Sequence, residues 1–238
     1  VEKEIAVLKA VGVVFKTDSP LGEKITLPGL KKDGFAATFL GLGAHVGAKL
    51  GVKGEELEGS TSAVDFLKGI SGNGHTKLTG KRVAIVGGGF TAMDSSRTAV
   101  RLGAREVFVL YRRTKEEMPA TAEELREAEE EGVKVMYLVA PQRILGKGKV
   151  EKIQMLNYVL GPTDSSDRRK PVEVPGTEFT LDVDLVISAV SQGVKADVGQ
   201  DLELTRWDTI VADEATQATN IDGVYAGGDC VRGPTNVI

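Results

Sequence analysis

The sequence predicts an α/β fold built on a parallel sheet, and three observations support this prediction. Between residues 81 and 139, apolar runs suited to buried strands alternate with segments of helical periodicity, in the order β-α-β-α-β. Each of the two predicted helices ends at a glycine, as helices commonly do. A glycine-rich turn joins the first strand to the first helix. Such alternation requires parallel strands connected by right-handed crossovers.

The N-terminal third predicts shorter and less regular elements. Apolar side chains recur at helical spacing over residues 1–11, and Gly12 is placed to end that helix. Short strands are expected at 13–16 and 36–40. The pattern Ser-Ala-Val-Asp resembles a capping box and opens a second helix at 62–69. The polar, glycine-rich loop that follows marks a domain boundary.

The rest of the chain predicts the parallel sheet and a set of β-hairpins. From residue 143 to 190 the pattern consists of β runs separated by turns, with a charged hairpin tip at 164–170. The acidic run at 123–131 is interpreted as the solvated face of a helix. The remaining predicted elements are strands at 81–86, 106–111, 133–139 and 224–226 and helices at 90–103 and 121–132.

Composition and charge exclude several classes of protein. The 238 residues carry a net charge of −4 without a long basic run, which argues against a nucleic-acid partner. No stretch approaches about 18 uninterrupted apolar residues, so we expect no membrane span. Cys230 is the single cysteine, and the two histidines are isolated. We therefore expect no disulfide, no metal site and no iron–sulfur cluster held by this chain alone, and a reducing cytoplasm as its location.

The strongest functional signal is a G-x-G-x-x-A fingerprint between a predicted strand and a predicted helix, the setting that dinucleotide binding requires. The first glycine makes the tight turn, the third lets the backbone approach a pyrophosphate, and the alanine lets helix and strand pack closely. The N–H groups of the first helical turn then face the phosphates. The alternative is a structural turn without a ligand. The predicted pyrophosphate-binding residues are Gly87, Gly88, Gly89, Phe90, Thr91 and Ala92.

The end of the second strand indicates which dinucleotide binds. A site for NAD places a carboxylate there, about 20 residues past the fingerprint, to bind the ribose 2′-hydroxyl. This strand instead ends in Arg112 and Arg113, whose guanidinium groups suit a 2′-phosphate. The alternative is that both are surface arginines paired with Glu116 or Glu117. We therefore expect NADPH rather than NADH.

Three separated blocks carry a resemblance to a known family. A strand at 224–226 leads into Gly-Gly-Asp, which resembles the motif by which FAD enzymes with two dinucleotide-binding domains hold the flavin ribitol. With VAIVGGGFTAMDSSRTAVRLGAREVFVLYRRTKEEMPA and EFTLDVDLVISAVSQ, the block GVYAGGDCVRGP makes the chain similar to the NADPH-dependent glutamate synthase small (beta) subunit family and related electron-transferring oxidoreductases. The blocks occur in the family's order, and the resemblance covers nearly the whole chain.

The resemblance implies a Rossmann-like NADPH-binding domain, residues 78–195, inserted in an incomplete FAD-binding domain made of residues 1–77 and 196–238. It also implies hydride transfer from NADPH to FAD, then electron transfer to iron–sulfur clusters and a large subunit or other acceptor. Transfer between bound cofactors needs no acid, base or nucleophile, so we assign no catalytic residue. The residues assigned by resemblance alone are Gly228 and Asp229 for the flavin and Val190 and Ser191 for the nicotinamide half.

Several features limit what this chain is expected to do alone. It begins with Val1 rather than methionine and lacks the family's iron–sulfur region and first glycine fingerprint, so we interpret it as a fragment that is inactive in isolation. FAD is expected only in the full-length protein. Phe90, Leu42 and Ser191 depart from the family pattern and leave open a non-catalytic nucleotide-binding or regulatory module. A simple NAD(P) dehydrogenase would need a substrate-polarising acid, for which the sequence offers no candidate.

Overall fold

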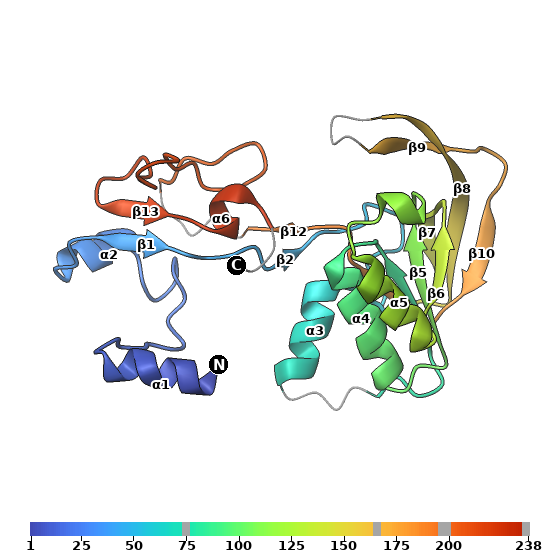
Figure 1. The fold of residues 1–238 in the computed structure, drawn as a ribbon, viewed down its shortest axis with the longest axis horizontal. Helices are drawn as coiled ribbons and strands as arrows, with labels where there is room; N and C mark the ends of the chain where they lie inside the picture. The colour runs from blue at the N-terminus through green and yellow to red at the C-terminus, as the bar shows by residue number, and fades with distance from the viewer. Residues whose placement is uncertain (73–76, 164–167, 195–200, 235–238) are drawn as a thin grey trace. The chain divides into compact units, whose positions relative to one another are not determined.

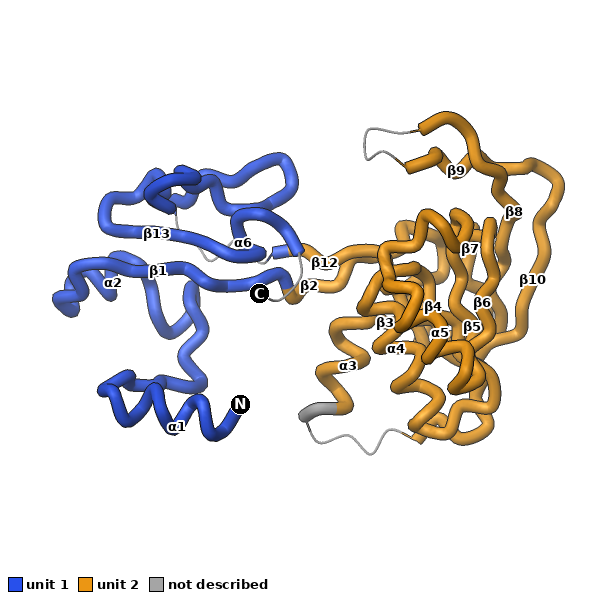
Figure 2. The backbone as a smooth tube through the Cα atoms, viewed as in Figure 1, with its two compact units in different colours: residues 1–44, 194–238 blue, residues 45–193 orange. Residues whose placement is uncertain are grey.

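A computed structural model describes residues 1–72, 77–163, 168–194 and 201–234. The chain forms two compact units, and each is described by itself (Figure 2). Unit 1 consists of residues 1–44 and 194–238, and unit 2 consists of residues 45–193. Figure 1 shows the order of the elements.

Unit 2 is built on a five-stranded sheet in which every neighbouring pair of strands is parallel. The strand order is β3-β11-β4-β5-β6. The parallel β-α-β-α-β arrangement predicted from the sequence is confirmed. The strands are β3 (Ser60–Ser62), β4 (Arg82–Val86), β5 (Glu106–Tyr111), β6 (Lys134–Tyr137) and β11 (Leu185–Ser188).

Helices cover one face of this sheet, and a second, antiparallel sheet covers the other (Figure 1). The helices are α3 (Ala63–Gly72), α4 (Phe90–Arg101) and α5 (Ala122–Glu130), with the 3-10 turn η1 (Lys115–Glu117) between β5 and α5. The antiparallel strands are β7 (Val139–Leu145), β8 (Lys152–Thr163), β9 (Arg169–Glu173) and β10 (Phe179–Asp182), in which β8 pairs with each of the other three.

The alternation of side chains along the parallel strands separates two hydrophobic cores. Val83, Ile85 and Ile187 are fully buried in the core that the sheet shares with the helices. Ala84 and Val186, one residue along on the same strands, are buried in the core shared with the antiparallel sheet. Both faces of the sheet are therefore covered, as parallel sheets require.

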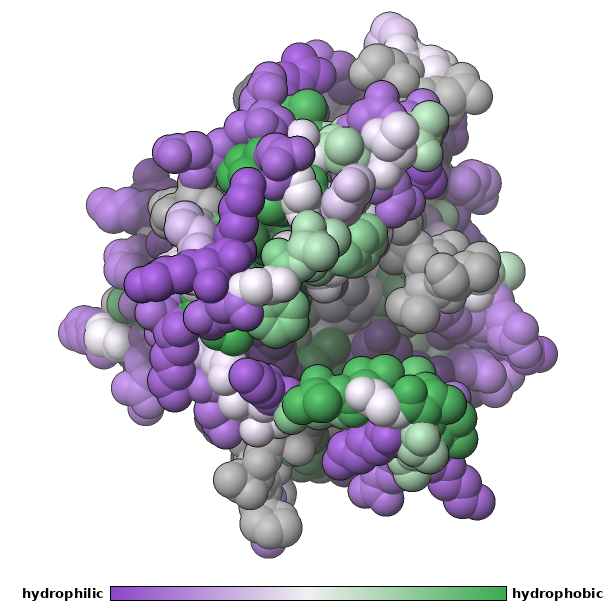
Figure 3. Space-filling model, turned by 90° about the vertical axis from the view of Figure 1, so that its left-hand side faces the viewer, coloured by the Kyte–Doolittle hydropathy of each residue, from purple (hydrophilic) through white to green (hydrophobic). Residues whose placement is uncertain are grey.

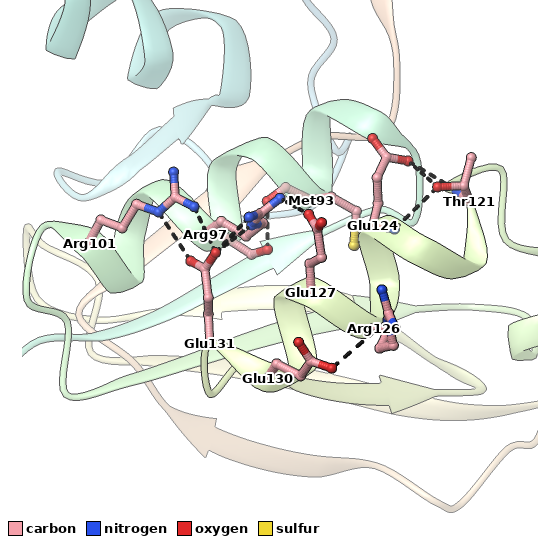
Figure 4. Close-up of polar contacts among 10 residues, drawn as sticks. Met93, Arg97, Arg101, Thr121, Glu124, Arg126, Glu127, Glu130 and Glu131 are labelled. Carbon is pink, nitrogen blue, oxygen red and sulfur yellow. Dashed lines mark hydrogen bonds and ion pairs between the residues drawn. The ribbon is translucent and has the colours of Figure 1, made fainter.

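A network of ion pairs fixes α5 against α4 (Figure 4). Arg97 on α4 donates to Glu127 at 2.6 Å and to Glu131 at 2.8 Å. Arg101 donates to Glu131 at 2.7 Å. Part of the acidic run that we interpreted as a solvated face thus faces the arginines of the neighbouring helix. Hydrogen bonding to these arginines lowers the pKa of Glu131.

Unit 1 is smaller. Its two-stranded parallel sheet pairs β1 (Thr38–Leu40) with β13 (Val224–Ala226), and its core includes the fully buried Ile210 and Cys230. Its helices are α1 (Glu2–Ala10), α2 (Leu27–Lys32) and α6 (Asp229–Arg232). Several hydrophobic side chains of residues 1–15 are exposed, and Figure 3 shows hydrophobic side chains gathered on the face that it draws.

Several local expectations need correction. Residues 13–16 form no strand. Helix α3 continues past Gly69 to Gly72. The strand expected at 133–139 is divided between β6 and β7, because Leu138 adopts a positive φ of 55° and the chain changes sheet there. The tip expected at 164–170 lies partly outside the described residues.

The division into units also differs from the expected domain boundary after residue 77. Residues 45–77 group with unit 2, because β3 pairs in parallel with β11 and α3 packs against α4. Two short strands, β2 (Val46–Gly47) and β12 (Gln192–Gly193), pair antiparallel at the edge of this unit. Which cofactor each unit serves stays a prediction. Among the described residues, no helix has the length and apolar character needed to cross a membrane.

Candidate functional site

The turn between β4 and α4 requires glycine at its first two positions for steric reasons. Gly87 has a φ of 142°, and a Cβ added there would lie 2.3 Å from the carbonyl oxygen of Ala189. A Cβ added at Gly88 would lie 2.6 Å from the ring of Tyr111. Tyr111 belongs to β5 and Ala189 directly follows β11, so the fold itself excludes larger residues at these two positions.

Gly89 is different, because neither its backbone conformation nor its neighbouring atoms require a glycine there. Its φ of −98° and ψ of −175° are extended values that any residue adopts. The nearest atom to an added Cβ is Cβ of Pro119, at 4.0 Å. A glycine that the surrounding protein does not require, at the N-cap of a helix, fits a backbone that a ligand approaches closely.

Helix α4 presents its N-terminus at this turn. Gly89 caps the helix without a side chain, so the first turn carries N–H groups and the positive end of the helix dipole toward the turn. Ala92 is fully buried in the core between helices and sheet, which agrees with the close helix–strand packing expected at that position. Phe90 is 39% exposed.

The segment after β11 lies beside the turn. The amide of Ala189 donates to the carbonyl of Val86 at 2.8 Å, and Gln192 donates from Nε2 to Oγ1 of Thr91 at 3.0 Å. Val190 and Ser191, both exposed, lie between these two contacts. The structure thus brings the segment assigned to the nicotinamide half next to the fingerprint. Sequence reasoning missed Gln192, for which spacing gave no signal.

The end of β5 also lies against the glycine turn. The ring of Tyr111 packs on Gly88, and its hydroxyl donates to the carbonyl of Glu117 at 2.6 Å. Burial raises the pKa of Tyr111, so the phenol stays protonated. Arg113 is only 5% exposed, and its Nε donates to the carbonyl of Arg169 at 2.8 Å.

The two arginines at this strand end have different surroundings. Arg112 is exposed and its charge acts on Tyr158 of β8. The alternative that we considered pairs these arginines with Glu116 or Glu117. In the structure, Glu117 forms an ion pair with Arg169 at 2.7 Å. Hydrogen bonding from Thr114 lowers the pKa of Glu117, which is therefore ionised at neutral pH.

A hollow of about 500 Å³ lies near the end of β5, and no sequence signal pointed to it. The residue that follows its lining segment 116–119 is Ala120, whose amide donates to the carbonyl of Gly88 in the glycine turn at 3.1 Å. The hollow is lined by Glu116, Glu117, Met118, Pro119, Arg168 and Arg169.

The residues assigned to flavin lie in unit 1. Gly228 has a φ of 75° and caps α6, whose first residue is Asp229. The thiol of Cys230 is buried and donates to the carbonyl of Leu40 at 3.2 Å, which holds α6 on the end of β1. Cys230 is therefore a packed residue of the core. Among the described residues, no group of three or more His, Cys, Asp or Glu side chains is arranged to hold a metal ion.

Comparison with known families and sequences gives consistent matches. The model of the pyridine nucleotide-disulphide oxidoreductase family matches residues 3–238. Over 99% of its length the chain is 41% identical to the NADP(+)-dependent formate dehydrogenase subunit beta of Moorella thermoacetica, and it covers 34% of that protein. Over its whole length it is 34% identical to the glutamate synthase [NADPH] small chain of Azospirillum brasilense, of which it covers 52%. The chain thus spans a third to a half of these relatives.

Solved structures show the same fold. FprA from Mycobacterium tuberculosis in complex with NADPH superposes with a TM-score of 0.76 at 22% identity, over 92% of this chain and 63% of that one. Thioredoxin reductase from T. acidophilum gives a TM-score of 0.63 at 22% identity, over 83% of this chain and 58% of the other.

Proposed function

Because this chain belongs to the pyridine nucleotide-disulphide oxidoreductase family, we propose that it is the NADPH-binding part of a flavin-dependent oxidoreductase. In the complete enzyme, hydride passes from NADPH to FAD. The observation that carries this proposal is Gly89, a glycine at a helix N-cap where an added Cβ meets no protein atom closer than 4.0 Å. The fold leaves this position open, and a pyrophosphate accounts for that.

The residues of unit 2 fit NADPH. Residues 87–92 would hold the pyrophosphate through backbone N–H groups at the start of α4. Arg112 and Arg113 would bind the 2′-phosphate, and no carboxylate ends β5 to favour NADH instead. Val190 and Ser191 lie beside the turn and would contact the nicotinamide half.

The residues of unit 1 are proposed to hold part of the flavin. Gly228, at positive φ, turns the chain from β13 into α6 and sets Asp229 at the start of that helix. Asp229 would accept hydrogen bonds from ribitol hydroxyls. FAD supplies the two-electron acceptance and one-electron release, and the protein supplies binding and orientation.

The electron acceptor is proposed from the relatives. Two of them are named as subunits, a formate dehydrogenase subunit beta and an NADPH-Fe(3+) oxidoreductase subunit beta from Geobacter sulfurreducens. A third is named a glutamate synthase small chain. We propose that the complete protein passes electrons through iron–sulfur clusters to a large subunit or another acceptor, and that it works in the cytoplasm, where its single buried thiol stays reduced.

Nucleotide titration tests the proposal directly. NADPH fluorescence should change on binding to the chain, and NADH should bind more weakly. In the complete protein, NADPH should bleach the flavin absorbance. Nucleotide binding without any flavin reduction in the complete protein would support the alternative, a non-catalytic binding or regulatory module. Absence of NADPH binding would refute the proposed function.

A further inference from the structure

The β8–β9 hairpin brings a second pair of arginines to the end of β5. Arg169 begins β9, Arg168 directly precedes it, and both line the hollow of about 500 Å³. The segment 116–119 also lines the hollow, and the next residue, Ala120, donates a hydrogen bond to the carbonyl of Gly88 in the fingerprint turn. Arg169 and Glu117, 52 positions apart in the sequence, thus line one surface.

Specific contacts hold the hairpin in this place. Arg169 donates from Nε and Nη2 to Oε1 of Glu117, both at 2.7 Å. Its carbonyl accepts the hydrogen bond from Nε of the buried Arg113. Glu117 in turn accepts hydrogen bonds from the amide and hydroxyl of Thr114. Arg168 is half-buried, and its charge acts on Tyr111, whose ring covers Gly88.

The charges of this surface favour a dianion. The two glutamates of the hollow are ionised, since hydrogen bonds from Thr114 lower the pKa of each. Arg168 and Arg169 line the hollow with these two glutamates, and two further arginines, Arg112 and Arg113, follow β5. These four cations outnumber the two carboxylates, and a phosphate monoester carries about −1.5 to −2 at neutral pH.

Of the two arginines that follow β5, the buried one offers few donors for such a group. Arg113 is 5% exposed, and its Nε is committed to the carbonyl of Arg169. Arg112 is exposed. A phosphate with three acceptor oxygens is best satisfied by several charged donors from different directions.

We propose that Arg168 contacts the 2′-phosphate of NADPH together with the arginines after β5 and so contributes to the preference for NADPH over NADH. Arg169 is a positioning residue, because its ion pair with Glu117 fixes the hairpin and its carbonyl fixes Arg113. This inference rests on the proposed function, since it requires that NADPH binds at the fingerprint turn.

Paired probes test the contact of Arg168. Adenosine 2′,5′-bisphosphate and adenosine 5′-diphosphate are titrated by calorimetry into the chain and into Arg168→Met. Loss of one charged contact should weaken the 2′-phosphorylated probe roughly 10-fold or more and leave the other unchanged. Lys170→Met, which removes an exposed cation from the next position of β9, is the matched control and should change neither. Equal weakening of both probes, or no change in either, would overturn the assignment.

The positioning role needs a different readout. Arg169→Met should reduce the NADPH-to-NADH affinity ratio, and Arg169→Lys, which preserves the ion pair with Glu117, should restore most of it. A merely structural role would lower thermal stability and the affinities for both nucleotides together. If the wild type binds no NADPH, the proposed function fails. If it prefers NADPH and Arg168→Met preserves that preference, only this inference fails.

Discussion

Gly87 and Gly89 stand two residues apart in one turn, and they are glycines for different physical reasons. Gly87 is constrained from within the fold by its φ of 142° and by the carbonyl of Ala189. Gly89 has an ordinary extended conformation and open space around it. The fingerprint pattern alone does not separate these roles, whereas the structure does.

Two substitutions distinguish the roles. Gly87→Ala should destabilise the protein by about 2 kcal/mol or more, because a Cβ meets backbone and the φ is unfavourable. Gly89→Val should lower stability by no more than about 1 kcal/mol, the cost of a poorer N-cap residue, and should weaken NADPH and NADH alike by roughly 10-fold or more, because the side chain occupies the place of the phosphate. Retained binding in Gly89→Val would mean that the nucleotide lies elsewhere.

Substitutions of the two arginines that follow β5 should also have different effects. Arg112 is exposed, so Arg112→Ala should weaken NADPH about 10-fold without changing stability. Arg113 is buried and hydrogen-bonded, so Arg113→Ala should weaken NADPH and also cost about 1–3 kcal/mol of stability. Fluorescence titration and urea unfolding measure both effects. Equal affinities of the wild type for NADPH and NADH would refute the assignment.

At the scale of the elements, helix ends were predictable where the cap is local. In α5 the hydroxyl of Thr121 accepts from the amide of Glu124 at 3.2 Å, and the Glu124 carboxylate accepts from the amide of Thr121 at 3.1 Å. This reciprocal capping box was readable from residues three apart in the sequence. The stabilisation therefore belongs to the helix start itself.

Removing this cap gives a measurable stability change. Thr121→Ala should lower the free energy of unfolding by about 1 kcal/mol, seen as a lower urea midpoint with an unchanged slope. Glu123→Gln, in the same helical turn but outside the capping box, should shift the midpoint only by a few tenths of a kcal/mol or less. If both variants unfold at the same urea concentration, the capping box contributes no measurable stability.

The same scale shows where sequence reasoning ended. Strands buried on both faces, such as β4 and β5, are apolar runs in the sequence. Their bounds were therefore predicted to within one residue. Strand β3 consists of three polar residues, and each pairs with a residue of β11 that lies 126 positions later in the chain, so no local pattern indicates this strand. No local pattern indicates the ion pair between Arg169 and Glu117 either, because it forms only when the distant β8–β9 hairpin contacts η1.

At the scale of the whole molecule, the two units differ in what they contain. Unit 2 contains a parallel sheet that is covered on both faces, and it contains the glycine turn. Unit 1 carries a two-stranded sheet and a smaller core. The chain spans a third to a half of the length of the first relatives.

This contrast predicts what the chain does in isolation. A FAD diphosphate requires a glycine-rich turn at a helix N-terminus, and the sequence contains one such fingerprint, which NADPH occupies in the proposed function. The flavin contacts that we propose for Gly228 and Asp229 should be too few to hold FAD against dilution. After dialysis against excess buffer, the 238-residue chain should therefore bind NADPH, show no absorbance band near roughly 450 nm and reduce no dye with NADPH. A dialysed chain that retains one FAD per molecule would show that unit 1 binds the flavin without a second glycine turn.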